Sequence, residues 1–348
     1  MSDEKILQDQ KAASKNISQA QEAAPQSDGR PLILRAENLF KSFNLEAGFF
    51  AKKDQSVYAV NDVSFDLRRG ETLGIVGESG CGKSTTARML VRMYEPTAGR
   101  VLYYPSGAQA QNIFDYKKKA LADYRRRVRY VFQDPARSLN PRMTSLSVLT
   151  DAFKFSPQKI SSDELRALAE KTFLEVGLTA RHLDKRPSEF SGGQRQRVSI
   201  ARALMMNPEL LICDEVVSAL DVSIQGQILN LLQDLRASKN LSFIFITHDL
   251  KVAGWFCDRI AVMYRGAIVE EAPAATLFQN ARHPYTKLLF DGAQGKAQAS
   301  SVEVTSVLSK ETGCPFVHRC PHAKPECSAA LPPLREVAEG HRVRCVLG

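Results

Sequence analysis

The stretch that decides the fold is GETLGIVGESGCGKSTT, residues 70–86. Its apolar run at residues 73–76 predicts a short buried strand, and the spacing over residues 85–94 predicts a helix. Between them, residues 77–84 match the pattern G-x-x-x-x-G-K-[ST]. The alternative is a glycine-rich turn that binds nothing. Strand, glycine loop and helix in this order instead favour a phosphate-binding loop.

The chemistry of this loop follows from its residue types. Glycines let successive backbone N–H groups turn around a phosphate with no Cβ in the way. The start of the following helix adds partial positive charge at the same point. We expect Lys83 to reach the β- and γ-phosphates of a nucleotide and the Ser84 hydroxyl to ligate Mg²⁺.

Composition sets the broad class. Of the 348 residues, 44% are hydrophobic, which is ample for a globular core. The formal charge of +9 suggests nucleic-acid or anionic-membrane binding, but no basic stripe interleaved with aromatic residues supports it. We expect the densest basic cluster, residues 125–127 with Arg129, to be a solvated helix face. No apolar stretch approaches the ~20 residues that span a bilayer, and the N-terminus lacks a secretory signal, so we predict a cytosolic chain.

Alternating strand and helix patterns predict an α/β fold with a mostly parallel sheet. Residues 36–43 and 57–67 alternate like a pair of antiparallel strands. The pattern is helical over 147–178. The expected units are a disordered polar arm at 1–31, a main domain at 32–290 with a helical part at about 134–205, and a linker with a cysteine-containing extension at 291–348.

Two further stretches carry candidate functional residues. Residues 210–213 predict a buried strand that ends in Asp214 and Glu215. Beside a phosphate loop, such an Asp helps to hold Mg²⁺ and the following Glu faces the attacking water; without the loop, the pair would be a solvated strand end. The stretch SGGQRQRVSIARAL, residues 191–204, opens a predicted helix with Ser191 and two glycines. This is an anion-ready helix start as well as an ordinary N-cap.

The stretch at 191–204 resembles the signature motif of ATP-binding cassette (ABC) ATPases, and the other motifs fit that family. The resemblance implies a RecA-like P-loop core with an antiparallel β subdomain and a helical subdomain. It makes residues 77–84 the Walker A loop and 211–215 the Walker B strand. It also implies a Q-loop glutamine at Gln133, a D-loop at 218–221, a switch histidine at His248 and an adenine-stacking aromatic at Phe43, with Tyr58 as the alternative. Val216 and Val217 stand where the family commonly has Pro-Thr, which leaves the two preceding carboxylates in place.

Carried over residue by residue, the resemblance implies a full site. The implied catalytic residues are Lys83, Gln133, Glu215 and His248. The implied ATP contacts are Phe43, Gly77, Glu78, Ser79, Gly80, Cys81, Gly82, Lys83, Ser84, Thr85, Gln133, Ser191, Gly192, Gly193, Gln194 and Asp221. The implied Mg²⁺ residues are Ser84, Gln133 and Asp214. Two such domains would pair head to tail, so that the phosphate loop of one chain faces the signature motif of the other across a shared ATP.

A narrower resemblance, to ATPases of dipeptide and oligopeptide importers, rests on residues 77–82, 131–135, 138–143, 283–286 and 313–345. It implies the ATP-hydrolysing subunit of a bacterial importer of dipeptides, oligopeptides or related small solutes, peripheral at the cytoplasmic face of the inner membrane. The implied partners are two membrane-spanning permeases, an identical or paralogous ATPase and an extracytoplasmic binding protein, with no nucleic acid. The rivals are a non-transport ABC ATPase acting on DNA or ribosomes and a non-hydrolysing regulatory subunit. Single-domain length without a coiled-coil insertion argues against the first rival, and Glu215 argues against the second.

The last candidate site is a group of cysteines in the extension: Cys314, Cys320, Cys327 and Cys345. In a reducing compartment such a group indicates metal ligation over disulfides. Zinc, an iron–sulfur cluster and unliganded thiols are all open, and no pair has the C-x₂-C spacing of zinc ribbons. The resemblance implies a [4Fe–4S] cluster in some members of this branch. We expect Pro315, Pro321 and Pro325 to keep the intervening chain out of helix so that the thiols converge.

Overall fold

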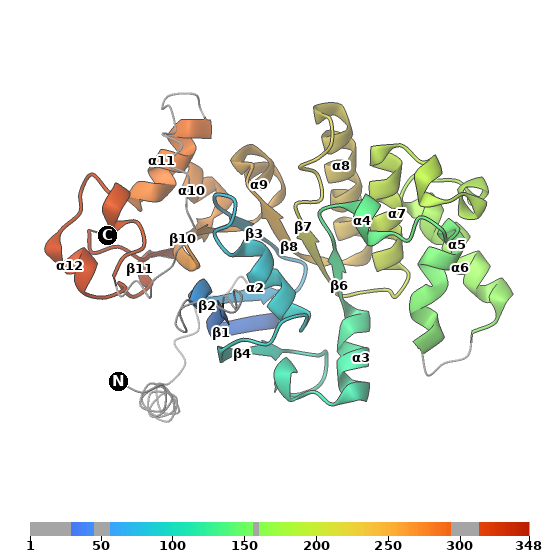
Figure 1. Cartoon of the computed structure of the whole chain (residues 1–348), viewed down its shortest axis with the longest axis horizontal. Helices are drawn as coiled ribbons and strands as arrows, with labels where there is room; N and C mark the ends of the chain where they lie inside the picture. The colour runs from blue at the N-terminus through green and yellow to red at the C-terminus, as the bar shows by residue number, and fades with distance from the viewer. Residues whose placement is uncertain (1–28, 45–55, 156–159, 294–312, 348) are drawn as a thin grey trace, which may run out of the picture.

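The computed structural model describes residues 29–44, 56–155, 160–293 and 313–347. Most of the predicted arm at 1–31 and residues 294–312 of the predicted linker and extension lie outside the described residues. The described strands form two sheets, and helices pack around them (Figure 1). No helix in the described ranges is long and apolar enough to cross a membrane.

The larger sheet has the strand order β11-β12-β10-β9-β3-β8-β7-β6. Its strands are β3 Thr72–Val76, β6 Val128–Val131, β7 Leu210–Asp214, β8 Ser242–Thr247, β9 Arg259–Tyr264, β10 Ala267–Pro273, β11 Arg335–Ala338 and β12 His341–Val343. Strands β9, β3, β8, β7 and β6 run parallel, as the alternating pattern predicted. Strand β10 pairs antiparallel with β9 and forms a hairpin with it.

The parallel strands are buried on both faces. In β8, Phe243 and Phe245 belong to one hydrophobic cluster, whereas Ile244 and Ile246 belong to the other. Every residue of β3, β7 and β8 is buried, which explains why these strands appear in the sequence as continuous apolar runs. The residues that follow their carboxyl ends are thereby held on a rigid edge.

The smaller sheet has the order β2-β1-β4-β5. It consists of β1 Leu32–Asn44, β2 Ser56–Arg68, β4 Ala98–Tyr103 and β5 Gln111–Asn112, and leads through the 3₁₀ turn η2 Ile113–Asp115 into helix α3 Lys118–Arg127. The predicted antiparallel pairing of β1 with β2 is confirmed. The basic cluster lies as expected on a helix, with Arg125 and Arg127 exposed in the last turn of α3, whereas Arg129 belongs to β6 and is partly buried. Arg125 Nη2 donates to the Arg92 carbonyl oxygen at 2.7 Å, and Arg127 pairs with Glu209 at 2.7 Å, so these side chains fasten α3 to its neighbours.

The helices of the core cover both faces of the larger sheet. They are α2 Lys83–Leu90, α8 Val222–Lys239, α9 Leu250–Phe256, α10 Ala274–Asn280 and α11 Pro284–Ala293. Residues of α2 share a hydrophobic cluster with the smaller sheet, and residues of α8, α9 and α10 share the other cluster with the helical region (Figure 1). The sheet is therefore sandwiched between two apolar layers.

The helical region lies at the opposite end of the molecule from the C-terminus (Figure 1). It consists of α4 Pro135–Ser138, α5 Ser145–Thr150, η3 Asp151–Phe155, α6 Ser162–Glu175, η4 Ala180–Asp184, η5 Pro187–Glu189 and α7 Gly192–Leu204. A continuous helical pattern over 147–178 is not what forms, since α5 and α6 are separate. Helix α6 begins at a capping box, in which Ser161 Oγ accepts from the Glu164 N–H at 3.2 Å and Glu164 accepts from the Ser161 N–H at 2.9 Å.

The C-terminal extension is built onto the larger sheet. After η6 Val317–Arg319 and α12 Pro325–Ala329, strands β11 and β12 add to the edge of β10. His341 Nε2 lies 2.7 Å from Glu270 Oε1, and both side chains are buried, which fastens β12 to β10. The expectation that the prolines exclude helix is wrong at Pro325, because proline is compatible with the first position of a helix.

Candidate functional site

The phosphate loop, residues 77–84, leaves the carboxyl end of β3 and enters α2. Gly82 has a φ of 106°, and a Cβ at this position would lie 2.2 Å from the Ala59 carbonyl oxygen. At Gly77 a Cβ would lie 2.1 Å from the Met263 carbonyl oxygen. The loop backbone thus approaches β2 and β9 more closely than any side chain would allow.

Lys83 is the first residue of α2 and is only 4% exposed. Its Nζ donates to the carbonyl oxygens of Gly77 at 2.8 Å and of Glu78 at 2.9 Å. The ammonium group therefore lies within the loop, where a phosphate would meet it. Burial raises the pKa of the adjacent Cys81 thiol although the Lys83 charge opposes this, so the thiol stays neutral.

The remaining residues of the phosphate loop form its tip and lead into α2. Ser79 and Gly80 form the exposed tip, and Thr85 is partly buried in the first turn of α2. The backbone N–H of Cys81 donates to the Glu78 carbonyl oxygen at 3.3 Å, which closes a turn at the tip. The geometry is that of a loop wrapped around the start of a helix, as the motif predicted.

Ser84 and Asp214 form the candidate magnesium site. Ser84 Oγ donates to Asp214 Oδ1 at 2.8 Å, and the Tyr130 hydroxyl donates to Asp214 Oδ2 at 2.5 Å. Asp214 is 1% exposed at the end of β7. Burial, followed by the nearby Asp214 carboxylate, raises the pKa of Tyr130 and keeps its hydroxyl a donor. A hydroxyl and a carboxylate are the oxygen donors that Mg²⁺ prefers, so these residues fit that ion.

Glu215 meets Gln133 and His248 at the same edge of the sheet. Glu215 Oε2 accepts from Gln133 Nε2 at 2.8 Å, and Oε1 lies 3.6 Å from His248 Nδ1. The three residues follow β7, β6 and β8, whose carboxyl ends meet where ligands bind in open parallel sheets. Glu215 has a φ of 48°, and its N–H donates to the Ile246 carbonyl oxygen at 3.0 Å. Such a strained backbone persists only where surrounding contacts fix it, and it is common at functional sites.

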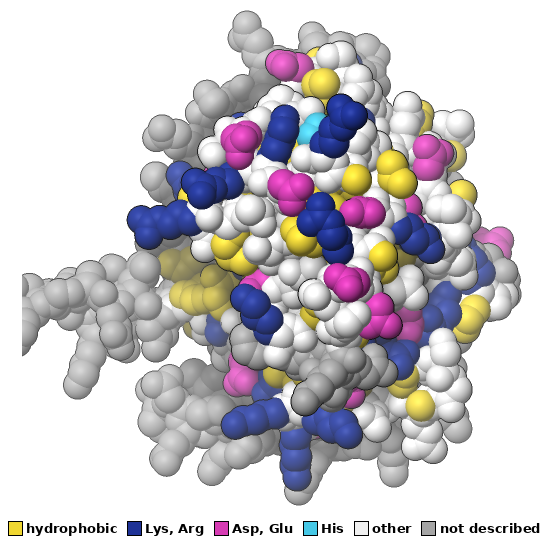
Figure 2. Space-filling view, turned by 90° about the vertical axis from the view of Figure 1, so that its right-hand side faces the viewer, with side chains coloured by type: hydrophobic (Ala, Val, Ile, Leu, Met, Phe, Trp, Pro, Cys, Tyr) yellow, Lys and Arg dark blue, Asp and Glu magenta, His cyan; other side chains and the backbone are white. Residues whose placement is uncertain are grey.

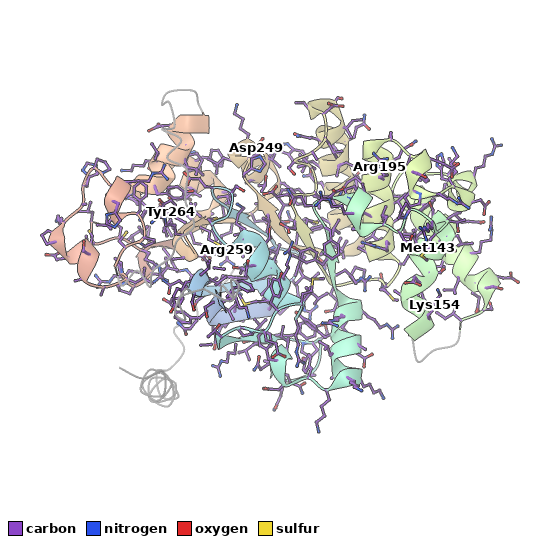
Figure 3. The ribbon with its side chains drawn as sticks, viewed as in Figure 1. Met143, Lys154, Arg195, Asp249, Arg259 and Tyr264 are labelled. Atoms are coloured by element: carbon purple, nitrogen blue, oxygen red, sulfur yellow. The ribbon has the colours of Figure 1, made fainter. Side chains whose placement is uncertain are left out.

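The signature motif lies elsewhere in the chain. Ser191 Oγ accepts from the Gln194 N–H at 3.3 Å and the Ser191 N–H donates to Gln194 Oε1 at 3.1 Å, so α7 begins at a capping box. Gly192 and Gly193 occupy its first turn. Figure 3 shows Arg195, near the start of α7, well apart from Asp249, which follows His248. In Figure 1, β8, β7 and β6 lie between α2 and α7. One chain therefore does not bring its signature motif to its own phosphate loop.

The D-loop at 218–221 begins three residues after Glu215. Ser218 Oγ donates to the Glu215 carbonyl oxygen at 2.9 Å, and Asp221 is exposed immediately before α8. Val216 and Val217 are 1% and 3% exposed, so the departure from Pro-Thr supplies apolar side chains to the core. The turn that positions Glu215 is thus stabilised by packing as well as by a hydrogen bond.

The predicted adenine-stacking residue lies in β1. The Phe43 ring meets the Tyr94 ring edge to face at 5.4 Å between centroids, and Lys41 Nζ lies 5.0 Å from the Phe43 centroid. Tyr58, the alternative, belongs to β2 and lies opposite Ser42 in the register. Both aromatic residues are therefore in the smaller sheet, and the choice between them remains a prediction.

The four C-terminal cysteines lie near one another. Burial raises the pKa of the Cys314 thiol, and the neighbouring thiols of Cys320, Cys327 and Cys345 add to this shift. The Cys314 N–H also donates to the Cys327 carbonyl oxygen at 2.7 Å. In the described part of the chain, however, no group of three or more His, Cys, Asp or Glu side chains is arranged to hold a metal ion. The structure therefore does not support the predicted [4Fe–4S] ligand set.

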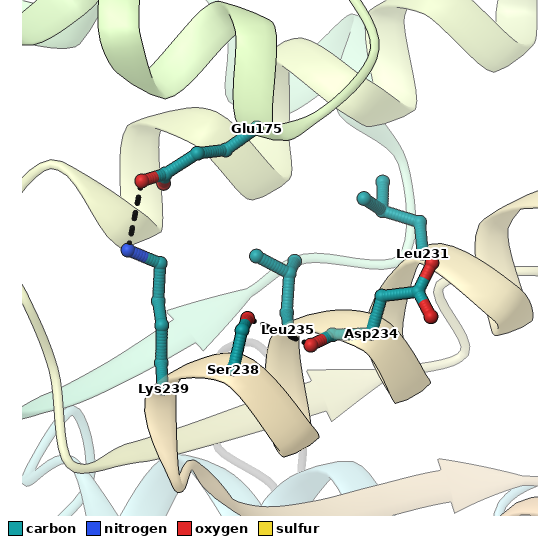
Figure 4. Close-up of a pocket in the computed structure, with 6 residues that line it drawn as sticks. All are labelled: Glu175, Leu231, Asp234, Leu235, Ser238 and Lys239. Atoms are coloured by element: carbon teal, nitrogen blue, oxygen red, sulfur yellow. Dashed lines mark hydrogen bonds and ion pairs between the residues drawn. The ribbon is translucent and has the colours of Figure 1, made fainter.

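A cavity of about 360 Å³ lies between α6 and α8 (Figure 4). It is lined by Glu175, Leu231, Asp234, Leu235, Ser238 and Lys239. Lys239 Nζ donates to Glu175 Oε1 at 2.9 Å across it, which links the helical region to the core. No lining residue belongs to the nucleotide site, so this cavity has no part in the candidate chemistry.

The sequence patterns did not predict two residues of the site, Tyr130 and Arg319. Tyr130 hydrogen-bonds Asp214, and its signal is its position on the strand that ends just before Gln133. Arg319 lies 3.2 Å from both carboxylate oxygens of Glu78, and no local pattern marks it. Both contacts join segments that lie far apart in the sequence.

Charge is interspersed on the end of the molecule formed by the helical region. Figure 2 shows Lys, Arg, Asp and Glu side chains mixed over this face, with hydrophobic side chains between them. The net positive charge is thus not gathered into one basic patch on this face. This agrees with the lack of a basic stripe in the sequence.

Two family models match the chain. The model described as "ABC transporter" matches residues 60–218, and the model described as "Oligopeptide/dipeptide transporter, C-terminal region" matches residues 269–327. The chain is 44% identical over 320 residues to a probable peptide ABC transporter ATP-binding protein of Sinorhizobium fredii, covering 90% of this chain and 89% of that protein. It is 42% identical over 324 residues to an oligopeptide transport ATP-binding protein of Bacillus subtilis, covering 90% and 97%.

Solved structures of similar fold are ATP-binding cassettes. A dimeric cassette with bound ADP and phosphate matches with a TM-score of 0.60 and 30% identity, covering 70% of this chain and 99% of that one. A component of an ABC transporter complex of Clostridium perfringens matches with a TM-score of 0.60 and 28% identity, covering 72% and 92%.

Proposed function

This chain belongs to the family of ABC transporter ATPases, and from that premise we propose that it hydrolyses ATP to power a bacterial importer of peptides. The observation that carries the proposal is the meeting of Ser84 with Asp214 and of Gln133 with Glu215 at one edge of the sheet, beside a phosphate loop. The two relatives that the chain matches over most of their length are peptide-transport ATP-binding proteins. The chain also matches the family model of the oligopeptide/dipeptide transporter C-terminal region.

In this proposal Glu215 is the general base for hydrolysis. It accepts a proton from the attacking water, and such a base contributes roughly 10²–10⁴-fold to the rate. Gln133 holds one carboxylate oxygen of Glu215, and His248 lies beside the other. His248 is exposed, so it is accessible to the γ-phosphate.

Lys83, Ser84 and Asp214 are the proposed phosphate and magnesium residues. When bound, Mg²⁺ neutralises charge on the phosphate oxygens. Ser84 and Asp214 supply oxygen donors for it, and Tyr130 keeps the Asp214 carboxylate in one orientation. Lys83 exchanges the loop carbonyls that it contacts here for phosphate oxygens.

The ATP site is completed by a second ATPase chain. Residues 191–194 and Asp221 are the proposed contacts across the dimer, because α7 lies far from the phosphate loop of its own chain (Figure 1). The start of α7 offers backbone N–H groups and the Ser191 hydroxyl to a phosphate. We propose that ATP draws two chains together and that hydrolysis separates them; the second chain is a copy or a paralogue.

The helical region is the proposed permease-docking surface. Gln133 lies at its start and contacts Glu215, so movement of this region reaches the base directly. We propose that the chain works at the cytoplasmic face of the membrane with two permeases, and receives cargo through an extracytoplasmic binding protein. The proposed units are the main domain at 32–290, its helical part at about 134–205 and the extension at 291–348.

An iron–sulfur cluster in the extension is a separate proposal. It rests on the proximity of four thiols, of which Cys314 and Cys327 are buried. The donor arrangement does not fit a metal in the described residues, so no step of the proposed ATP chemistry depends on it.

The test is transport by the assembled complex. The chain is purified with its two permeases and a partner ATPase, and the complex is placed in vesicles with ATP on the side of the ATPases. Peptide uptake and ATP hydrolysis should both depend on Mg²⁺ and should both fail with Glu215→Gln. ATP hydrolysis without peptide uptake for any peptide length would contradict the import function while leaving the ATPase.

A further inference from the structure

The C-terminal extension contacts the phosphate loop through one arginine. Arg319 Nη1 lies 3.2 Å from Oε1 and 3.2 Å from Oε2 of Glu78, across 241 residues of sequence. Glu78 is the second residue of the phosphate loop. The side chains of Arg319 and Glu78 are 20% and 33% exposed, so the ion pair is partly shielded from water.

Aromatic side chains hold this ion pair in place. The Arg319 guanidinium lies 5.8 Å from the Tyr264 ring centroid and 5.7 Å from that of Phe316, and it donates to the Tyr264 hydroxyl at 3.4 Å. The Tyr285 ring meets Tyr264 at 4.4 Å and Phe316 at 5.5 Å. Its hydroxyl accepts from the Glu78 N–H at 3.1 Å. Rings of the core and of the extension thus form one support beneath the loop.

Glu78 is therefore held at each of its polar groups. Arg319 contacts its carboxylate, the Tyr285 hydroxyl accepts from its N–H, and Lys83 Nζ donates to its carbonyl oxygen at 2.9 Å. A carboxylate in a loop that receives a triphosphate repels the ligand unless a cation is paired with it. An unpaired Glu78 would also compete with phosphate for the Lys83 ammonium.

We propose that Arg319 is a positioning residue for ATP binding, acting through Glu78 to neutralise the phosphate loop and fix its shape. The C-terminal extension then contributes to ATP binding at the nucleotide site. This inference rests on the proposed role of residues 77–84 in binding the phosphates of ATP.

The experiment measures ATP affinity and turnover of the full chain carrying Arg319→Met. The KM for ATP and the Kd of a fluorescent ATP analogue should rise about 10-fold while kcat changes less than about 2-fold, because the lost interaction serves binding equally in the ground and transition states. Arg319→Lys keeps the charge without the planar fork and should give an intermediate KM. In a Glu78→Gln background, Arg319→Met should change KM by no more than about 2-fold, since no unpaired carboxylate remains.

Arg342→Met is the matched control. Arg342 Nη2 pairs with Glu271 Oε2 at 2.6 Å and anchors the same extension to β10 without touching the loop. Arg342→Met should lower the Tm of the chain but leave the KM for ATP unchanged. An equal rise of KM in Arg342→Met, or an undiminished effect of Arg319→Met in the Glu78→Gln background, would overturn the inference.

Different results would overturn the further inference and the proposed function. Unchanged ATP affinity in Arg319→Met, with a wild-type chain that binds ATP, would overturn the inference alone. A wild-type chain that binds no ATP would overturn the proposed function, and the inference with it.

Discussion

Gln133 Nε2 donates to Glu215 Oε2 at 2.8 Å, which joins the end of β6 to the end of β7. Gln133 is exposed and begins the connection into the helical region, whereas Glu215 is the proposed base. A displacement of the helical region therefore acts on the orientation of the base through one side chain. This contact connects the start of the proposed permease-docking surface to the proposed base.

Replacement of Glu215 by Gln should slow hydrolysis at least about 10²-fold, because the amide cannot accept the proton of the attacking water. ATP binding should persist, and size-exclusion chromatography in ATP should show an accumulated dimer. Glu209→Gln is the control at the opposite end of β7. Glu209 pairs with Arg69 at 2.7 Å and lies outside the site, so this variant should lose stability and keep turnover. Near-normal turnover in Glu215→Gln would remove that residue from the role of base.

Tyr130→Phe should raise the Mg²⁺ concentration that activity requires, because Asp214 Oδ2 loses a donor at 2.5 Å. A lost buried hydrogen bond to a charged group costs about 1.5–3 kcal/mol, so we expect both lower stability and a several-fold higher Mg²⁺ requirement. Tyr103→Phe is the matched control, since its hydroxyl donates to Glu209 at 3.1 Å away from the site. It should cost stability without shifting the Mg²⁺ titration; equal shifts in both variants would contradict a role of Tyr130 at the site.

The helical region should contact a membrane subunit. A photoreactive residue in place of Arg137, whose side chain is 91% exposed on α4, should crosslink to a permease in the assembled complex. The same probe at the exposed position Glu336 on β11 is the control and should crosslink weakly or not at all. Crosslinks confined to the β11 probe would place the docking surface on the extension instead.

Acid should destabilise the chain through His283. Burial lowers the pKa of this side chain to about 4, from 6.5. Between these values the unfolded chain binds a proton that the folded chain does not, so stability should fall as the pH falls from 6.5 towards 4. The loss should reach about 3 kcal/mol. Chemical denaturation at several pH values compares wild type with His283→Asn, which cannot titrate. Parallel stability profiles for the two proteins would exclude His283 as the cause.

Metal analysis decides the role of the cysteines. Chain purified without oxygen should contain about four irons and four sulfides and show a visible absorption band if the thiols hold a [4Fe–4S] cluster. Both should disappear in Cys320→Ser. Cys257→Ser is the control, because Cys257 is buried in the main domain and lies outside the group. Colourless, iron-free protein with a folded extension would refute the cluster and leave the thiols as packing residues.

The sequence by itself determined the local parts of the site. A strand, a glycine loop and a helix within residues 70–94 predicted the phosphate loop, and a buried strand ending in Asp214 and Glu215 predicted the acidic edge. These features are encoded by neighbouring residues, because apolar runs, glycine conformations and helix starts depend on short-range geometry. The order of strands and helices was enough to predict a mostly parallel sheet.

Only the tertiary structure decided which distant residues meet. Tyr130 reaches Asp214 across 84 residues, and Arg319 reaches Glu78 across 241. The extension continues the main sheet, because β12 pairs with β10 and buries His341 against Glu270. Such contacts depend on strand register and on the burial of charges that need partners, and neither is written in the spacing of a local motif. The phosphate loop can therefore be recognised in the sequence, whereas the contacts of Tyr130 and Arg319 with residues of the site form only in the folded chain.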